Sequence, residues 1–513
     1  MYPEPDVTQP ETTEPPVDIE PPPEIPDRVT PTRGLFTLRY VPGGTLNPIT
    51  ETNKDNLLLT SLMYESLFVL DGGLYPEPQL CESWDTEDYI TFRIRIKPNI
   101  AMSDGTWLTA DDVAYTFRQA LLKGHYVNIF SSVVSVTSDG DLTVTIVLNT
   151  PNSRFIRLLD VPIIKSGSID QRIPPGTGPY NFSGDGPVWL ERFSRYRDYR
   201  RLPISMIFLL ECSDDEMTQK FDDGEISLLK DDPTDAFDMR LNRLNEPRYF
   251  DTTTIQFIGF NGRSGIMRDP YVRRAIGCAI DRQYIVDNIM PVQATIPAPL
   301  PLSRAFSLYD MEWERRDLDP LVEMAWLLDT AGLQDYDDDS FLELTNWAGG
   351  YYKFTVDFIV NGENMHKIRA AHFIADTLRE SGFDITVREL PWESYMSALR
   401  AGTFDMYYGE IALGADFNLS PLLLPGALNF GGTSSTTYKP FIDDFLYARS
   451  QYEIQYAVGR LLDEIERNAP FVPVLYKRYA IYFPVGAISG SSPSQSNVFR
   501  NITNWTIDLT MLS

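Results

Sequence analysis

Residues 83–117 read SWDTEDYITFRIRIKPNIAMSDGTWLTADDVAYTF. Residues 91–98 alternate apolar and polar side chains, which is the period of a half-buried strand. A turn is predicted at residues 103–105, and Thr109 then fits the N-cap of a helix whose third residue, Asp112, can reach back to it as in a capping box. Apolar side chains recur at every fourth position of that helix, the spacing of a buried stripe: Val113, Phe117 and Leu121.

Three aspartates in this stretch raise the question of a metal site or a general acid/base pair: Asp104, Asp111 and Asp112. Asp104 falls in the turn, and the other two fall in the first turn of the helix. Carboxylates there complement the positive end of the helix dipole by ~0.3–1 kcal/mol each. We therefore interpret the three carboxylates as structural rather than catalytic.

The composition predicts a large, acidic protein. The chain has 513 residues, 43% of them hydrophobic, which is enough for two or three domains. A net charge of −28 repels phosphate backbones, so we expect no nucleic-acid partner. No run of about 18 uncharged apolar residues occurs that would span a membrane. Three cysteines lie far apart; we expect buried free thiols, and one disulfide with an odd thiol stays open: Cys81, Cys212 and Cys278.

Residues 1–32 differ from the rest of the chain. They contain ten prolines, and eight acidic residues against one arginine. Proline removes backbone donors, like charges repel, and little apolar surface is available for burial, so we expect a disordered, extended tether. This polar segment is not a cleavable secretory signal. We expect that the start at Met1 replaces a removed targeting segment.

Predicted strands and helices alternate in the second half of the chain. Strands are predicted at residues 353–360, 383–390 and 404–411, and helices between them at 366–382 and 392–402. This order is typical of an α/β lobe in which helices cover a largely parallel sheet.

The earlier part of the chain mixes hairpins with helices. Residues 132–148 form two β-branched runs joined by Asp139 and Gly140, a strong hairpin signal. Further on, residues 255–261 are predicted to form a strand and residues 269–290 a single helix.

Motifs for catalysis or metal binding are missing from the sequence. Of the three histidines, His366 and His372 are six residues apart, not the four that would direct both to one zinc ion on a helix. No zinc-protease, P-loop, dinucleotide-binding or serine-hydrolase motif occurs. A glycosidase pair of carboxylates from distant segments stays open. We therefore predict no catalytic residue, no metal ligand, no cofactor and no enzyme activity.

The stretch 83–117 resembles the signature region of the family 5 extracellular solute-binding proteins, the peptide- and nickel-type binding components of ABC importers. Further similar motifs follow in the family's order and extend the resemblance over residues 35–485. They are GTGPY (176–180), GEISLL (224–229), FNGRSGIMRDPYVRRAIGCAIDRQYIV (260–286), AWLLDTAGL (325–333), GFDITVRELPWESYMSALRAGTFDMYYGEIALGADF (382–417) and APFVPVLY (469–476).

The resemblance implies an α/β fold. The expected architecture is a two-lobed clamp like that of the type II periplasmic binding proteins, in the large peptide-binding class, with discontinuous domains and a hinge. Lobe I would consist of residues 33–261 and 486–513, with a subdomain of about 51–160, and lobe II of residues 262–485. The ligand would lie between the lobes, which close around it.

The resemblance also implies a ligand-binding segment. In peptide binders of the family, an aspartate in an Ala-Asp-aromatic stretch holds the α-ammonium group of the ligand, and ALGADFN (412–418) places Asp416 at that position. A partly buried ammonium group needs a charge partner, which suits a carboxylate. Gly414 and Ala415 would present backbone groups along an extended peptide. The alternative is that Asp416 is a loop carboxylate in solvent.

Three more positions match ligand-lining positions of the family. Trp392 corresponds to a tryptophan that lines the ligand, His366 to a position near its far end, and Phe257 to an aromatic residue of the cleft. For each a structural alternative stays open: core packing for Trp392 and Phe257, and an exposed helix start for His366.

Two departures from the family pattern bear on the ligand. Cys81 replaces the usual alanine, and Tyr408 stands where some oligopeptide binders carry an arginine that pairs with the peptide carboxylate. The absence of this arginine leaves the length and even the peptide nature of the ligand open, because the family also binds oligosaccharides and nickel chelates.

The resemblance implies a non-catalytic solute-binding protein that delivers short peptides to an ABC permease. We expect a monomer outside the cytoplasmic membrane, lipid-anchored to the cell surface through the tether or periplasmic if the cell has two membranes. The alternatives are another solute, a sensor, or a secreted hydrolase.

Overall fold

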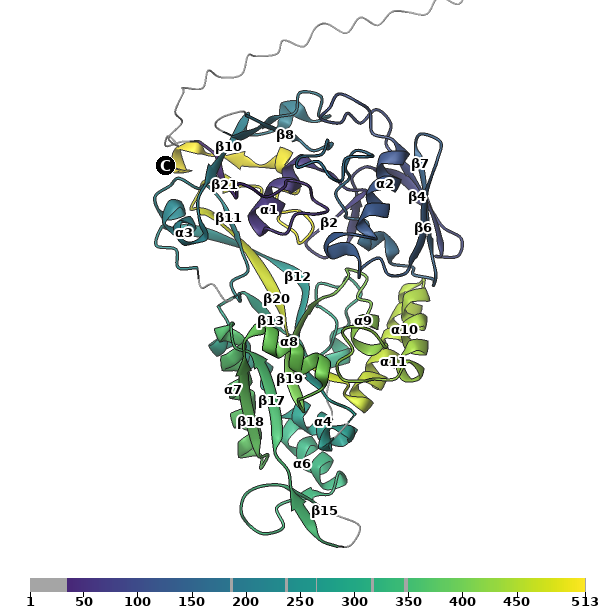
Figure 1. Ribbon diagram of the computed structural model, residues 1–513, viewed down its shortest axis with the longest axis vertical. Helices are drawn as coiled ribbons and strands as arrows, with labels where there is room; N and C mark the ends of the chain where they lie inside the picture. The colour runs from purple at the N-terminus through teal and green to yellow at the C-terminus, as the bar shows by residue number, and fades with distance from the viewer. Residues whose placement is uncertain are drawn as a thin grey trace, which may run out of the picture.

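The computed structural model describes residues 35–184, 188–235, 239–263, 265–314, 318–345 and 349–512. The expected tether at residues 1–32 lies outside this range. Figure 1 shows two bodies of unequal fold joined by the long strands β12 (Asn245–Phe260) and β20 (Phe471–Pro484). Buried side chains group accordingly, so we call residues 35–250 with 480–512 the first part and residues 255–476 the second part.

The first part contains two four-stranded sheets. One has the order β1 (Thr37–Tyr40), β10 (Met206–Glu211), β9 (Trp189–Arg192), β8 (Tyr180–Ser183), and β1 is parallel to β10. The other is antiparallel, in the order β4 (Cys81–Asp85), β5 (Thr91–Ile96), β7 (Thr143–Leu148), β6 (Val133–Asp139). Its last two strands are the predicted hairpin. The remaining elements are α1 (Lys54–Met63), β2 (Phe68–Leu70), β3 (Pro76–Pro78), α2 (Ala110–Ala120), α3 (Asp214–Asp222), β11 (Leu229–Asp231), β21 (Ile488–Ser489) and β22 (Thr506–Ile507).

The opening stretch folds as its sequence predicts. It supplies β5 and α2, and the backbone N–H of Thr109 donates to Asp112 Oδ2 at 2.9 Å, which is the expected return bond of the capping box. The Asp104 carboxylate accepts from the backbone of Thr106 at 2.9 Å within the turn. All three aspartates of this stretch thus have structural surroundings, since Asp111 accepts from Ser138 of the neighbouring strand.

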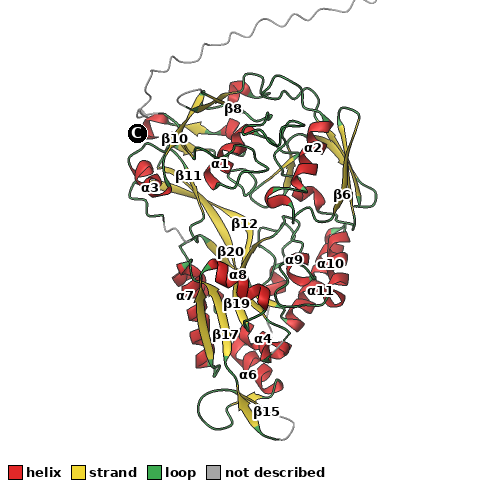
Figure 2. Ribbon diagram, viewed as in Figure 1, coloured by secondary structure: helices red, strands yellow, loops and turns green. Residues whose placement is uncertain are grey.

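A seven-stranded mixed sheet runs through both parts in the order β11, β20, β12, β19, β17, β18, with β13 paired to β20. Strand β11 lies in the first part, and β13, β17, β18 and β19 lie in the second. The predicted alternation is confirmed as β17 (Val356–Asn361), α7 (Met365–Glu380), β18 (Ile385–Leu390), α8 (Trp392–Ala401) and β19 (Met406–Ala412). Strand β17 is parallel to both neighbours, β18 and β19. Figure 2 shows α10 and α11 together on one side of this sheet. The other elements are α4 (Pro270–Cys278), β13 (Thr295–Pro297), α6 (Pro320–Thr330), β14 (Leu333–Gln334), β15 (Glu343–Thr345), β16 (Tyr351–Lys353), α9 (Ser420–Leu423), α10 (Ser435–Tyr447) and α11 (Gln451–Asn468).

The single helix predicted at residues 269–290 is wrong. Helix α4 ends at Cys278, and a short helix α5 (Arg282–Tyr284) begins after a break and continues into one π-turn. The Asp281 side chain accepts from the backbone N–H of Tyr284 at 2.9 Å. Aspartate prefers such an N-cap to a helix interior, so it starts a second helix where the apolar pattern alone suggested one.

Strands β12 and β20 carry the chain from one part to the other. Their outer ends bury Phe250 and Ile481 in the core of the first part, whereas Phe257 and Phe471 pack in the second part. The register of the two strands shifts between Asp251 and Ile255, at the level where the two cores meet. In the range that the structure describes, no helix combines the length and apolar character that a membrane crossing requires.

Candidate functional site

A cavity of about 280 Å³ lies between the two parts. The first part lines it with one face of α1, with residues 157–162 and with residues 495–498, while the second part contributes residues 413–415. Another cavity, of about 310 Å³, lies between α4 and α11 within the second part. Because only the first of these has walls from both parts, a change in their separation can enclose or release a molecule there.

The segment after β19 is held in place by two hydrogen bonds between Leu413 and Thr253. The backbone N–H of Leu413 donates to the carbonyl of Thr253 at 3.1 Å, and the Thr253 hydroxyl donates to the Leu413 carbonyl at 2.7 Å. Gly414 and Ala415 follow and line the cavity. The two residues predicted to present backbone groups therefore lie in the wall of the cavity between the two parts.

Gly414 has a steric reason to be glycine. A Cβ atom at this position would lie 2.6 Å from Asp416 Oδ1 and 2.9 Å from Leu158 Cδ2. The missing side chain lets the Asp416 carboxylate approach the backbone that lines the cavity.

Asp416 is 2% exposed and binds groups of the first part. Its Oδ2 accepts from Asn152 Nδ2 at 2.8 Å, its Oδ1 accepts from the backbone N–H of Asn418 at 3.2 Å, and its carbonyl accepts from Arg154 Nε at 3.3 Å. Burial raises the pKa of Asp416 above its ordinary value, and the Asn152 amide and the Arg154 guanidinium oppose this only in part. The carboxylate is thus not in solvent, and it is incompletely compensated.

Arg154 anchors the same junction. Its Nη2 donates to the carbonyl of Phe445 at 2.6 Å, and its guanidinium lies 3.8 Å above the Phe445 ring. The neighbouring Ser153 donates from its backbone N–H to Leu446 at 2.8 Å. Burial lowers the pKa of Arg154 to about 9, with the Asp416 charge acting against it.

The cavity also contains ionisable groups that the sequence analysis missed. Burial raises the pKa of Asp160 to about 6. Lys230 lines the cavity as well, and burial lowers its pKa. Within the described residues, Lys230 Nζ makes no hydrogen bond or ion pair. Isolated charged residues in strands and turns carry no sequence signal, so only their convergence in space identifies them.

A second contact between the two parts is made of ion pairs. Lys477 on β20 binds Asp232, which follows β11, and lies 3.3 Å from Glu410 Oε2 on β19. Lys367 Nζ is 3.1 Å from the same Glu410 oxygen. Burial acts to raise the pKa of Glu410, but Lys367 and Lys477 outweigh it and the pKa is lowered.

The other three predicted site residues lie outside the cavity. Trp392 is 47% exposed at the start of α8 and stacks on Tyr395 with ring centroids 6.0 Å apart. His366 opens α7 with Nδ1 3.3 Å from the carbonyl of Ile289. Phe257 is 3% exposed and packs edge-on against Phe471 at 5.4 Å. The structure therefore groups Gly414, Ala415 and Asp416 and separates these three from them.

Comparison with known proteins identifies relatives over most of the chain. The profile of the bacterial extracellular solute-binding proteins, family 5 (middle region), matches residues 75–427. The periplasmic oligopeptide-binding protein OppA of Salmonella typhimurium is 22% identical over 485 residues, which cover 86% of this chain and 87% of that protein.

Two solved structures share the fold. The oligopeptide-binding protein AppA from Bacillus subtilis in complex with a nonapeptide has a TM-score of 0.65 at 19% identity, covering 93% of this chain and 98% of that one. NikZ from Campylobacter jejuni in complex with Ni(L-His) has a TM-score of 0.67 at 17% identity, covering 93% and 100%. These matches confirm the predicted periplasmic-binding-protein-like clamp.

Proposed function

We propose that this chain, which belongs to the family 5 bacterial extracellular solute-binding proteins, captures short peptides between its two parts and delivers them to an ABC permease. The observation that carries the proposal is the cavity between the parts, which combines the backbone of residues 413–415 with an acidic and a basic side chain, Asp160 and Lys230. A peptide zwitterion offers backbone hydrogen bonds and two opposite end charges, and these are the groups that such a cavity complements. The similarity to oligopeptide-binding proteins of two organisms supports this choice.

The two parts would act as lobes of a clamp, with residues 255–261 of lobe I packed in the second part and residues 480–485 of lobe II packed in the first. We propose lobe I as residues 33–261 with 486–513, including the subdomain at about 51–160, and lobe II as residues 262–485. These boundaries fall just after β12 and β20, so the two paired strands would flex as the hinge. Closure then depends on ligand contacts made in only one arrangement of the lobes.

Asp416 is our candidate partner for the ligand's α-ammonium group. Its Oδ1 lies directly behind Gly414 at the cavity wall, and an ammonium group there would supply the positive charge that Asn152 does not. The backbone groups of Gly414 and Ala415 would bind the peptide chain next to it. Trp392, His366 and Phe257 remain candidates for contacts in an arrangement of the lobes with a bound ligand.

The remaining features follow from this role. We propose a monomeric, non-catalytic protein outside the cytoplasmic membrane, with residues 1–32 as a tether to a lipid anchor. A tether of this composition keeps the clamp clear of the membrane surface. Upstream codons without an apolar signal ending in a cysteine would rule out the anchor.

Native mass spectrometry of the purified protein tests the proposed ligand. We expect co-purifying peptides of a few residues, released on denaturation and exchangeable against an added peptide library. Protein that shifts its melting temperature with oligosaccharides or nickel chelates, and never with peptides, would overturn peptide capture and favour another solute.

A further inference from the structure

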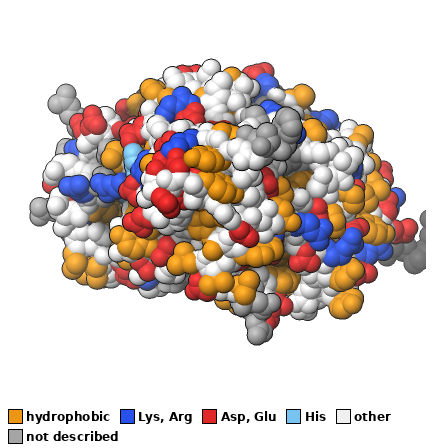
Figure 3. Space-filling view, turned by 90° about the horizontal axis from the view of Figure 1, so that it is seen from below, with side chains coloured by type: hydrophobic (Ala, Val, Ile, Leu, Met, Phe, Trp, Pro, Cys, Tyr) orange, Lys and Arg blue, Asp and Glu red, His pale blue; other side chains and the backbone are white. Residues whose placement is uncertain are grey.

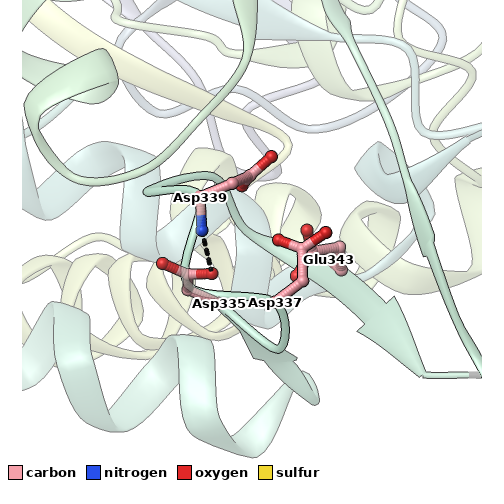
Figure 4. A group of neighbouring side chains, drawn as sticks. All are labelled: Asp335, Asp337, Asp339 and Glu343. Atoms are coloured by element: carbon pink, nitrogen blue, oxygen red, sulfur yellow. Dashed lines mark hydrogen bonds between the residues drawn. The ribbon is translucent and has the colours of Figure 1, made fainter.

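The loop between β14 and β15 gathers four carboxylates at the end of the second part farthest from the first (Figure 1). One oxygen from each side chain lies within 4.8 Å of the others: Asp335, Asp337, Asp339 and Glu343. Figure 4 shows Glu343 beside Asp337, with Asp335 and Asp339 on the same loop. In the view from this end, acidic and basic side chains are otherwise intermixed over the surface (Figure 3). Four carboxylates this close repel one another unless a cation lies among them.

Glu343 distinguishes this group from an ordinary acidic surface. Its side chain is fully buried at 0% exposure. Oε2 accepts from the backbone N–H of Tyr336 at 2.8 Å, but in the part of the chain that the structure describes Oε1 receives no hydrogen bond. An ionised oxygen buried without a donor is costly, so it points to a positive group that binds there.

Lys353 on β16 partly fills that role. Its Nζ pairs with Asp339, lies 3.2 Å from Asp337 Oδ2 and is 3.8 Å from Glu343 Oε1. One ammonium group faces four carboxylates, and the lysine side chain is 54% exposed. Because a long exposed lysine can withdraw into solvent at little cost, it can give way to a cation of higher charge.

Hydrogen bonds from the loop backbone hold the carboxylates in place, and the carboxylate oxygens keep lone pairs available for a metal ion. Asp335 accepts from the backbone N–H groups of Asp339 and Ser340 at 3.1 and 2.9 Å. A carboxylate has about four lone-pair sites, so each oxygen that accepts one amide can still bind a metal ion. Ser340 has φ = +75°, which turns the chain sharply after Asp339.

We propose that this loop is a binding site for Ca²⁺. The donors are all hard carboxylate oxygens, which suit Ca²⁺ and Mg²⁺ rather than zinc or nickel. Calcium–oxygen distances of 2.3–2.6 Å put opposite ligands about 4.6–5.2 Å apart, whereas magnesium requires about 4.0–4.2 Å. The four oxygens lie within 4.8 Å of one another, which leaves room for the larger ion.

The spacing of the ligands agrees with this ion. Asp335, Asp337, Asp339 and Glu343 stand at positions 1, 3, 5 and 9 of a loop, which are ligand positions of 12-residue calcium loops. The flanking elements here are strands instead of helices, so the loop is not an EF-hand. The prediction of no metal ligand rested on histidine spacing, on known motifs and on the structural role of Asp104, Asp111 and Asp112, and this loop matches none of those motifs.

The bound ion would hold the loop between β14 and β15 against the rest of the second part. Leu342, next to Glu343, packs against the core of the second part and donates from its backbone N–H to Gly382 after α7 at 2.8 Å. A cation that draws the carboxylates together would hold this loop on α7. Since the site is remote from the cavity between the parts, we expect no change in ligand affinity.

Isothermal titration of the full chain with CaCl₂, after dialysis against a chelator and in about 0.1 M KCl to screen diffuse binding, tests the site. We expect one site with a dissociation constant in the range of about 10⁻⁴–10⁻³ M known for extracellular modules, and weaker binding of Mg²⁺. Asp337→Asn should weaken binding at least about tenfold, because calcium affinity depends on ligand charge. The matched control is Asp338→Asn, which removes a charge from the same loop but outside the group of four.

Lys353→Met provides a second arm that does not remove a ligand. Without the competing ammonium group, calcium should bind at least about tenfold more tightly and raise the melting temperature further than in the wild type. No saturable binding in either the wild type or Lys353→Met would overturn the proposal and leave an internal ion-pair network. Equal weakening by Asp337→Asn and Asp338→Asn would also overturn it, since it would indicate attraction to a generally acidic surface.

Discussion

Asp416 and Glu410 are two carboxylates of the same segment at the junction of the two parts, and burial acts to raise the pKa of both. At Glu410 the ammonium groups of Lys367 and Lys477 outweigh burial, and the pKa is lowered. At Asp416 an amide and a guanidinium do not outweigh it, and the pKa is raised. The protein therefore compensates the charge of Glu410 with positive groups, but it compensates the charge of Asp416 only in part.

This difference suggests separate roles for Glu410 and Asp416, two acidic residues that lie close together in the sequence. Glu410 belongs to a contact in which the nearly buried Lys477 links β20 to Asp232 of the first part. We expect it to stabilise the junction. Asp416 is the carboxylate for which an added ammonium group brings the larger gain, which is the property required of a ligand anchor.

The largest expected effect is that of Asp416→Ala on peptide affinity. If Asp416 binds the α-ammonium group, its removal leaves that charge buried and unpaired, at a cost on the order of 2–5 kcal/mol. Isothermal titration with a co-purified peptide measures the loss. The melting temperature should fall only slightly, because Arg154 keeps the Asp416 carbonyl as its acceptor and only the Asn152 amide and the backbone N–H of Asn418 lose a partner.

If Asp416→Ala binds peptide with the affinity of the wild type, Asp416 does not bind the ligand and only joins the two parts. An N-acetylated peptide offers an independent control. It lacks the ammonium group, so it should bind weakly to the wild type, and its affinity should be nearly the same for Asp416→Ala.

Glu410→Gln should show the opposite pattern, with a smaller effect. The substitution leaves Lys367 without its partner and Lys477 with Asp232 alone. Removing one partner of a buried pair costs about 3–5 kcal/mol, but the Glu410 side chain is 25% exposed and Lys477 keeps one carboxylate. We therefore expect a loss of about 1–2 kcal/mol in the free energy of unfolding, measured by urea titration, with little change in peptide affinity.

A large loss of affinity in Glu410→Gln with unchanged stability would reverse the two roles. Lys367→Met tests the same contact from its other side. It should destabilise the protein less than Glu410→Gln, because Glu410 then keeps Lys477.

Much of the fold was predictable because its local patterns agree with its tertiary structure. The capping box at Thr109, the hairpin at Asp139 and Gly140, and the alternation from β17 to β19 each have a short-range physical cause. The broken helix after Cys278 was missed since its apolar pattern continues across the break while Asp281 caps a new helix.

The candidate site was less predictable because it is assembled across the junction. Asp416, Gly414 and Ala415 were found through a motif, but Asn152 and Arg154, which bind Asp416 from the first part, carry no motif of their own. The same holds for Asp160 and Lys230, whose relevance depends on the cavity that they line. A sequence specifies such groups only through the fold.

The smallest expected effect is the pH dependence of peptide affinity. It concerns Asp160, another buried carboxyl group, whose pKa burial raises to about 6. A ligand ammonium group favours the ionised form, so peptide affinity should rise with pH and be about tenfold lower at pH 5 than at pH 7. Stability without ligand should change in the opposite direction. Because the folded-state pKa exceeds the ordinary value of about 3.9, this group's contribution to stability is lost as pH rises from about 4 to about 6.

Asp160→Asn separates this contribution from that of Asp416, whose pKa is also raised. The difference in affinity between wild type and variant, measured by titration, should level off above about pH 6, and the difference in melting temperature, measured by calorimetry, should develop between about pH 4 and about pH 6. Arg157 and Lys230 line the same cavity, and burial lowers the pKa of each. Both are present in wild type and variant, so their titration cancels in the difference between the two proteins. A pH profile that is the same in both proteins would show that Asp160 does not face the ligand, and the pH dependence would then be assigned to Asp416.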